Sequence, residues 1–213
     1  MKELGVNNIS NFDDNFNGEG MKLIPSSITH LLIRNCYQIK DDDLKHLPPN
    51  LIELEIKNCE FSGIGFQYLP LSLKKLEIDG NCLTDEGMKV LHNITTIQFL
   101  DLQYNRILTN DGIKYLPLSL TSLIFKNNLK ITSECLLSLP SNLIKLEINE
   151  SNSEIESSEI LSRIPSSIKD LKLCYFNINK GEIKYLHSNI QKLQFLQCKV
   201  DEESMKSLPK GKF

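Results

Sequence analysis

Apolar positions recur along the chain in a fixed phrase, and the phrase occurs eight times. Each copy has a central Leu, a second apolar residue two positions later and a third three positions earlier. The central leucines follow one another every 22 to 25 residues: Leu31, Leu54, Leu76, Leu100, Leu123, Leu146, Leu171 and Leu193. Apolar residues two positions apart, with mostly polar residues between them, predict a short β-strand with one buried face. The sequence therefore predicts eight strands in a tandem array.

The remainder of each unit predicts a short helix. A side chain that can accept hydrogen bonds from the free N–H groups of a helix start recurs at the beginning of the helical half in every unit. These capping residues are Asp41, Ser62, Thr84, Thr109, Thr132, Ser157, Asn179 and Asp201. Apolar residues follow at helical spacing, as Met88 and Leu91 do. A proline such as Pro70 often ends the unit, because it lacks the N–H that a continuing helix needs.

A column of mostly Asn and Cys residues follows the strands. Its members are Cys36, Cys59, Asn81, Asn105, Asn128, Ser151, Phe176 and Cys198. An Asn here can hydrogen-bond the backbone of neighbouring turns, and Cys fills the same small slot. With this column the pattern reads L-x-x-L-x-L-x-x-N/C-x-L, as in LSLKKLEIDGNCL at residues 71–83, and it resembles the leucine-rich repeat family. Ser151 and Phe176 depart from the pattern, so we expect an irregular column there.

The resemblance covers about residues 24–208 and implies an α/β fold. The family's fold is a solenoid, a curved horseshoe with a parallel β-sheet on the concave face and short helices on the convex face. We expect residues 1–23 to form an N-terminal cap, because NGEGMKLIP at 17–25 imitates the helical half TDEGMKVLH at 84–92. Residues 24–208 would hold the eight repeats and residues 209–213 a C-terminal tail. A single unit buries too little to fold alone, so the array is the cooperative unit.

Charge and composition narrow the possible partners. The chain has 213 residues and a net charge of −3, whereas a nucleic-acid surface usually needs a marked excess of Lys and Arg. The start, MKELGVNNIS, lacks the apolar core of a signal peptide, and no stretch has the length of a membrane span. We expect a monomer in the cytoplasm that binds no nucleic acid and does not insert into membranes.

The six cysteines are widely spaced and form neither a C-x-x-C pair nor a zinc-site pattern. This spacing indicates a reducing, intracellular compartment. Cys36, Cys59 and Cys198 fall in the Asn/Cys column and are expected to be buried. Cys82 and Cys174 are the two expected to be accessible.

Candidate catalytic groups each have a simpler structural interpretation. His92 and His187 stand where other units have Pro, just after a helix, where a histidine interacts favourably with the helix dipole. Carboxylates are expected to cluster on the strands, and a glycosidase-like acid pair is conceivable for them. They would lie on an open face among lysines, however, and no known catalytic motif is present. We expect no enzymatic activity, no metal and no cofactor.

The polar residues between the buried strand positions form the concave face. Glu55, Glu77 and Asp101 stack there in consecutive units, so Lys57 and Lys75 are expected to compensate their repulsion. A solvated, salt-bridged sheet would explain these charges equally well. Large apolar and aromatic residues beside charges are, however, typical of protein-binding hot spots. The predicted binding residues are Glu55, Glu77, Phe99, Asp101, Tyr104, Ile124, Lys126 and Tyr175.

The family resemblance implies a non-catalytic protein–protein interaction scaffold that binds a partner protein through the concave face. The L-P-x-x-L-x-x-L opening of the units also looks like that of repeats in effectors that bacterial pathogens inject into host cells. On that interpretation the chain would be secreted into the host cell without a classical signal peptide. The alternative function is the substrate-recognition component of a ubiquitin-ligase assembly, with catalysis supplied by another chain.

Overall fold

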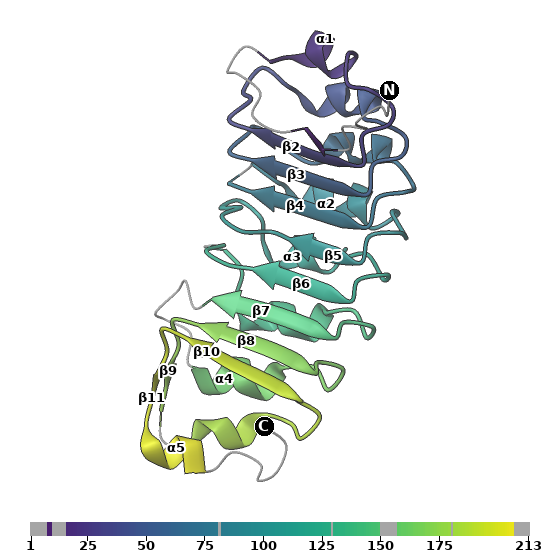
Figure 1. Cartoon of the computed structure of the whole chain (residues 1–213). Coiled ribbons are helices and arrows are strands. Elements are labelled where there is room, and N and C mark those ends of the chain that lie inside the picture. The colour runs from purple at the N-terminus through teal and green to yellow at the C-terminus, as the bar shows by residue number, and fades with distance from the viewer. Residues whose placement is uncertain are drawn as a thin grey trace, which may run out of the picture.

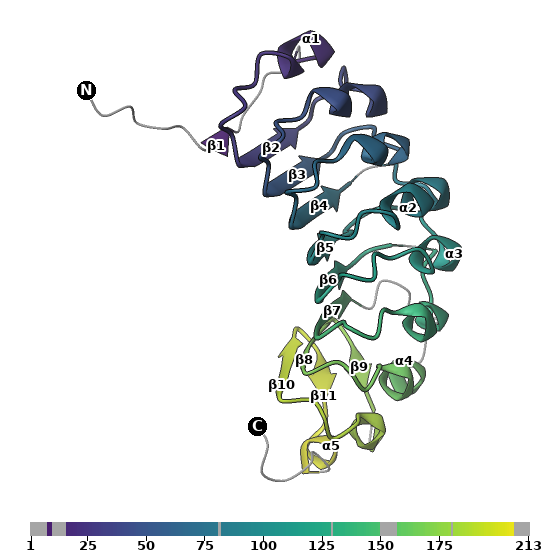
Figure 2. The same ribbon diagram turned by 90° about the vertical axis from the view of Figure 1, so that its right-hand side faces the viewer.

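The computed structural model describes residues 8–9, 16–80, 82–128, 130–149, 157–179 and 181–206. Stacked parallel strands form one face of the chain and short helical segments form the opposite face (Figure 1). Seen from the side, the strand face is concave and the helical face is convex (Figure 2). The predicted α/β solenoid is confirmed.

Within the described residues, the main sheet has nine parallel strands in chain order. They are β1 (Asn8–Ile9), β2 (His30–Arg34), β3 (Glu53–Lys57), β4 (Lys75–Asp79), β5 (Phe99–Asp101), β6 (Ser122–Phe125), β7 (Lys145–Asn149), β8 (Asp170–Cys174) and β10 (Lys192–Leu196). A separate pair joins β9 (Asn177–Ile178) to β11 (Lys199–Val200). Every central leucine lies opposite the next one, from Leu31 and Leu54 to Leu171 and Leu193. The register predicted from the sequence is therefore confirmed.

Short helical segments cover the other side of the strands, and four of those described are 3-10 turns. They are α1 (Gly18–Met21), η1 (Asp41–His46), η2 (Ile64–Tyr68), α2 (Asp85–Leu91), α3 (Asn110–Ile113), η3 (Ser133–Ser138), α4 (Ser157–Arg163), η4 (Glu182–Tyr185) and α5 (Glu202–Lys206). Each segment has only a few residues before the chain must turn back to the next strand. The tighter 3-10 geometry suits such short pieces.

The hydrophobic core is one continuous stack between the strands and the helical segments. The central leucines of the inner units, such as Leu76 and Leu100, are 0% exposed. The stack thins at β10, where Leu193 and Phe195 are only partly buried. Burial of each leucine contributes about 1.5–3 kcal/mol, so the inner units contribute more to stability than the last one.

The Asn/Cys column binds each unit to its neighbours. Asn128 Oδ1 accepts a hydrogen bond from the Asn105 backbone N–H at 2.7 Å, and Asn128 Nδ2 donates to the Leu102 carbonyl at 2.7 Å. Cys198 Sγ takes the same place, 3.4 Å from the backbone nitrogen of Phe176 and 3.2 Å from the Leu173 carbonyl. Asn81 and Ser151 lie outside the described residues.

The predicted helix caps are correct in part. Thr84, Thr109 and Thr132 accept hydrogen bonds from the first N–H groups of their own helical segments, as predicted. Asp41 does not cap η1. Its carboxylate instead accepts from the backbone N–H groups of Ser62, Gly63 and Gly65 in the next unit, at 2.9–3.0 Å. The acid at the start of one helical segment therefore caps the following one.

Asp85 repeats the arrangement, because its carboxylate accepts from the Thr109 backbone N–H at 2.9 Å. The convex side thus has its own line of contacts between units, parallel to the Asn/Cys column. A pattern of capping residues read along the sequence cannot show whether a side chain turns toward its own segment or toward its neighbour.

Two cysteine predictions need correction. Cys174 was expected to be accessible but is 1% exposed, because the last residue of β8 lies under the side chains of neighbouring strands, with Glu147 Oε1 3.7 Å from its Sγ. Cys198 was expected to be buried but is half-buried, because β10 is the outermost described strand of the main sheet and no described strand lies beyond it. Cys82 is exposed and Cys36 and Cys59 are buried, as predicted.

Within the described part of the chain, no helix has both the length and the apolar character that crossing a bilayer requires. At the N-terminal end, β1 pairs with β2, and Ile9 lies opposite Leu31. The division into residues 1–23, 24–208 and 209–213 stays a prediction, and the tail lies outside the described residues.

Candidate functional site

The concave face presents the polar positions of each strand, and six of the eight predicted binding residues lie on it. Glu55 is on β3, Glu77 on β4, Phe99 and Asp101 on β5, and Ile124 on β6, with Lys126 directly after β6. Register places Glu55 opposite Glu77, Glu77 opposite Asp101, and Asp101 opposite Ile124. The strand alternation therefore gathers these side chains along one line across the sheet.

Tyr104 and Tyr175 lie elsewhere than predicted. Their column was expected on the sheet face, but it forms the tight turn after each strand, with positive φ in every described member: Asn35, Asn58, Gly80, Tyr104, Asn127, Tyr175 and Gln197. Asn and Gly adopt this left-handed conformation easily, whereas a tyrosine there carries a cost of about 1–2 kcal/mol. Both tyrosines, at φ 55° and 63°, are about half exposed at the rim of the concave face.

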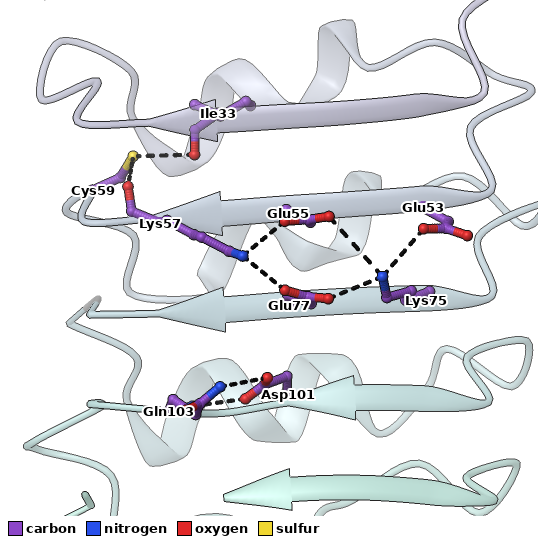
Figure 3. A network of polar contacts seen from close by, with 9 residues as sticks. All are labelled: Ile33, Glu53, Glu55, Lys57, Cys59, Lys75, Glu77, Asp101 and Gln103. Carbon is purple, nitrogen blue, oxygen red and sulfur yellow. Dashed lines mark hydrogen bonds and ion pairs between the residues drawn. The ribbon is translucent and has the colours of Figure 1, made fainter. Parts of the chain in front are cut away.

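A network of ion pairs joins β3 and β4 (Figure 3). Lys57 Nζ lies 2.8 Å from Glu55 and 2.9 Å from Glu77, and Lys75 Nζ lies 2.9 Å from Glu77 and 3.2 Å from Glu53. The expected compensation by Lys57 and Lys75 is present. Burial by itself would raise the pKa of Glu77, but the two lysines outweigh it and hold that pKa below its usual value. Glu77 is thus held ionised, which suits a structural ion pair better than a general acid.

Asp101 is in the opposite situation. Its side chain is 5% exposed and accepts hydrogen bonds from the Gln103 backbone N–H at 3.2 Å and from Gln103 Nε2 at 2.7 Å (Figure 3). Burial raises its pKa to about 6, and the nearby charges of Glu77 and Asp79 act in the same direction. The sequence indicated that an acid stands on this face. It could not indicate that Asp101 is buried, because the side chains that cover it belong to neighbouring units.

We expect Asp101→Asn to stabilise the protein by about 2 kcal/mol at pH 8 and to change little at pH 4. The pKa of Asp101 is raised on folding, so its contribution to stability is fully present below the unfolded value near 4 and is lost as pH rises through 6. Asn has the same shape and no charge to desolvate. Urea unfolding of both proteins from pH 4 to pH 8 measures the difference, and a difference that stays constant with pH would contradict the explanation.

A hollow of about 450 Å³ lies in the concave face over the strands from β5 to β10. Phe99 and Ile124 line its apolar part, and Lys145, Glu147 and Lys172 are among its polar lining residues. Lys75 Nζ lies 5.5 Å from the centre of the Phe99 ring, within the range of a cation–π contact. The hollow therefore combines partly exposed apolar side chains with charges of both signs.

Among the described residues, no three His, Cys, Asp or Glu side chains lie close enough together to hold a metal ion. His92 ends α2, where its backbone N–H donates to the Met88 carbonyl, which agrees with the structural role predicted for it. His30 lies on the concave face, with its Nε2 3.4 Å from Glu53.

Comparisons with known proteins bear on the family. A family model described as Leucine Rich repeat matches residues 71–91 and 93–116. A homologue of the protein phosphatase 1 regulatory inhibitor subunit PPP1R7 from Arabidopsis thaliana is 29% identical over 160 residues, which cover 74% of this chain. The match covers 42% of that protein, so the chain spans less than half the length of this curated relative.

Two solved structures share the fold. The leucine-rich repeat-containing protein LegL7 from Legionella pneumophila is 16% identical, with a TM-score of 0.55 over 88% of this chain and 78% of its own. Internalin C2 from Listeria monocytogenes is 20% identical, with a TM-score of 0.58 over 90% of this chain and 80% of its own. At these identities the likeness concerns the fold alone. The matched repeats and the shared fold support a leucine-rich repeat protein.

Proposed function

We propose that the chain is a non-catalytic scaffold that binds a partner protein through its concave face. The observation that carries the proposal is the hollow, where Phe99 and Ile124 stand partly exposed among charged side chains. Tyr104, in the turn after β5, is half exposed. Exposed aromatic and aliphatic groups surrounded by charges are typical of binding hot spots.

The Arabidopsis relative supports the same general role. By its name it is a homologue of a regulatory inhibitor subunit of protein phosphatase 1, a protein that regulates another protein. The ubiquitin-ligase alternative stays a prediction. The secreted-effector interpretation stays one too, because the likeness to the bacterial proteins concerns only the fold.

A triple variant tests the binding face: Phe99→Ala, Tyr104→Asn and Ile124→Ala. We expect it to lose at least about tenfold in affinity for the partner, since the centre of an interface carries most of the binding energy. Asn replaces Tyr104 because it accepts the positive φ, so that substitution relieves strain while removing the ring. The measurement is capture from a lysate of the organism that encodes the chain, followed by titration of the captured protein.

The matched control changes three apolar side chains of the convex side: Ile64→Ala, Tyr68→Ala and Leu137→Ala. These residues are exposed on η2 and η3 and have sizes similar to the concave set. Capture that survives in the control and is lost in the concave variant supports the proposal. Capture that is equal in both variants, with both folded by circular dichroism, overturns it.

A further inference from the structure

The concave face is divided into two halves of opposite charge. Over β2 to β5, five carboxylates stand against three cations: Glu53, Glu55, Glu77, Asp79 and Asp101 against Arg34, Lys57 and Lys75. Over β6 to β8 and β10, four lysines stand against two carboxylates: Lys126, Lys145, Lys172 and Lys192 against Glu147 and Asp170. We call these the acidic half and the basic half. The net charge of the whole chain conceals this division.

The ion pairs show the same excess at the level of single contacts. In the acidic half one lysine is shared between two acids, since Lys57 contacts both Glu55 and Glu77. In the basic half one acid is shared between two lysines, since Glu147 contacts both Lys126 and Lys172. The internal pairs therefore leave each half with the sign of its majority.

Two lysines of the basic half are especially open to a partner. Lys145 is exposed on β7 and has no ion pair with any other residue in the part of the chain that the structure describes. Lys192 on β10 is paired only loosely, with its Nζ 3.3 Å from Asp170 and 58% of its side chain exposed. Both line the hollow.

An uncharged boundary separates the halves. Phe99 lies opposite Ser122 at the change of sign, and Ile124 stands beside them on β6. These side chains form the apolar part of the hollow. From β2 to β10, the concave face therefore presents negative charge first, then the apolar side chains of Phe99 and Ile124, and then positive charge.

We propose that the face receives an extended polypeptide segment whose charges are arranged in the opposite order. Its acidic residues lie over the basic half, an apolar side chain is seated on Phe99 and Ile124, and its basic residues lie over the acidic half. Complementary charge fixes the register and speeds the encounter of such partners. Six strand spacings of about 4.8 Å separate β3 from β10, so a segment of about nine residues spans the face. This proposal rests on the proposed function and specifies the partner's chemistry.

Two fluorescent peptides of equal composition test it. The block peptide carries three Glu, a Gly-Leu-Phe centre and three Lys; the alternating peptide has the same residues with the charges interleaved. At low ionic strength we expect the block peptide to bind at least about tenfold more tightly by fluorescence anisotropy. The preference should shrink as salt rises toward 0.5 M, since exposed charges are screened.

Charge reversal locates the effect. Lys145→Glu with Lys192→Glu is expected to abolish the preference for the block peptide. The matched control is Lys89→Glu with Lys114→Glu, two exposed lysines on the convex side, each paired with a carboxylate three residues before it. It should bind both peptides as the unmodified chain does.

Three results would overturn the proposal: equal binding of the two peptides, an equal loss in the convex control, or equally tight binding of a 12-nucleotide oligo(dT). The last would mean that the basic half attracts any polyanion. None of these results bears on the scaffold proposal. That proposal fails only if the capture of every bound protein is independent of Phe99, Tyr104 and Ile124. The two proposals can therefore fail separately.

Discussion

Replacing Asn128 by Ala is expected to lower the free energy of unfolding by about 3 kcal/mol. The side chain is 3% exposed and satisfies two backbone groups, the Asn105 N–H and the Leu102 carbonyl, each at 2.7 Å. Ala would leave both groups buried without these bonds, and each unsatisfied buried group costs about 1–3 kcal/mol. Urea denaturation followed by circular dichroism measures the change.

Asn128→Cys is the matched control, and we expect it to lose only about 1 kcal/mol. Cysteine already occupies this place in other units, where Cys198 Sγ lies within reach of both the Phe176 nitrogen and the Leu173 carbonyl. If the Ala and Cys variants lost equal stability, side-chain hydrogen bonding in this column would not be what holds the units together.

Gly65→Ala is expected to destabilise the array by about 3 kcal/mol. A Cβ at Gly65 would lie 2.0 Å from the Asp41 carbonyl oxygen and 2.6 Å from its carbon, so it would meet backbone that has no rotamer to change. Relief requires η2 to move away from η1, which would also stretch the bonds from the Asp41 carboxylate to the Ser62 and Gly63 N–H groups. The midpoint of urea unfolding is the measurement.

Gly181→Ala is the control for Gly65→Ala, because it tests the cost of the backbone conformation without a close contact. Gly181 has φ +77°, but a Cβ there would meet nothing within 4 Å, so Ala should cost only about 1–2 kcal/mol, from the left-handed conformation. A loss at Gly181 as large as at Gly65 would show that the contact between helical segments is not the cause.

The strand register was predictable because it depends on one strong periodic signal. A one-residue shift would turn every central leucine outward, so the pattern from Leu31 to Leu193 allows only the observed pairing. The Asn/Cys column was predictable for a similar reason: a small hydrogen-bonding residue recurs at one place in the unit.

The contacts between units were harder to predict. Asp41 has the position and chemistry of a helix cap, and only the structure shows that it caps η2 rather than η1. The burial of Asp101 and Cys174 likewise depends on side chains supplied by adjacent strands. A signal for the turn column was present, since Asn35, Asn58 and Gly80 are residues that favour positive φ, whereas Tyr104 gives no such indication.

The partly open core of β10 has a thermodynamic consequence for binding. Leu193 and Phe195 are half-covered, and in a solenoid each unit is stabilised mainly by its neighbours, so this strand opens more readily than β5 does. Lys192 and Gln194 of the same strand line the hollow. Opening of β10 and binding of a segment to the concave face are therefore linked equilibria. A bound segment holds β10 closed, so the measured affinity includes the free energy of keeping that strand in place.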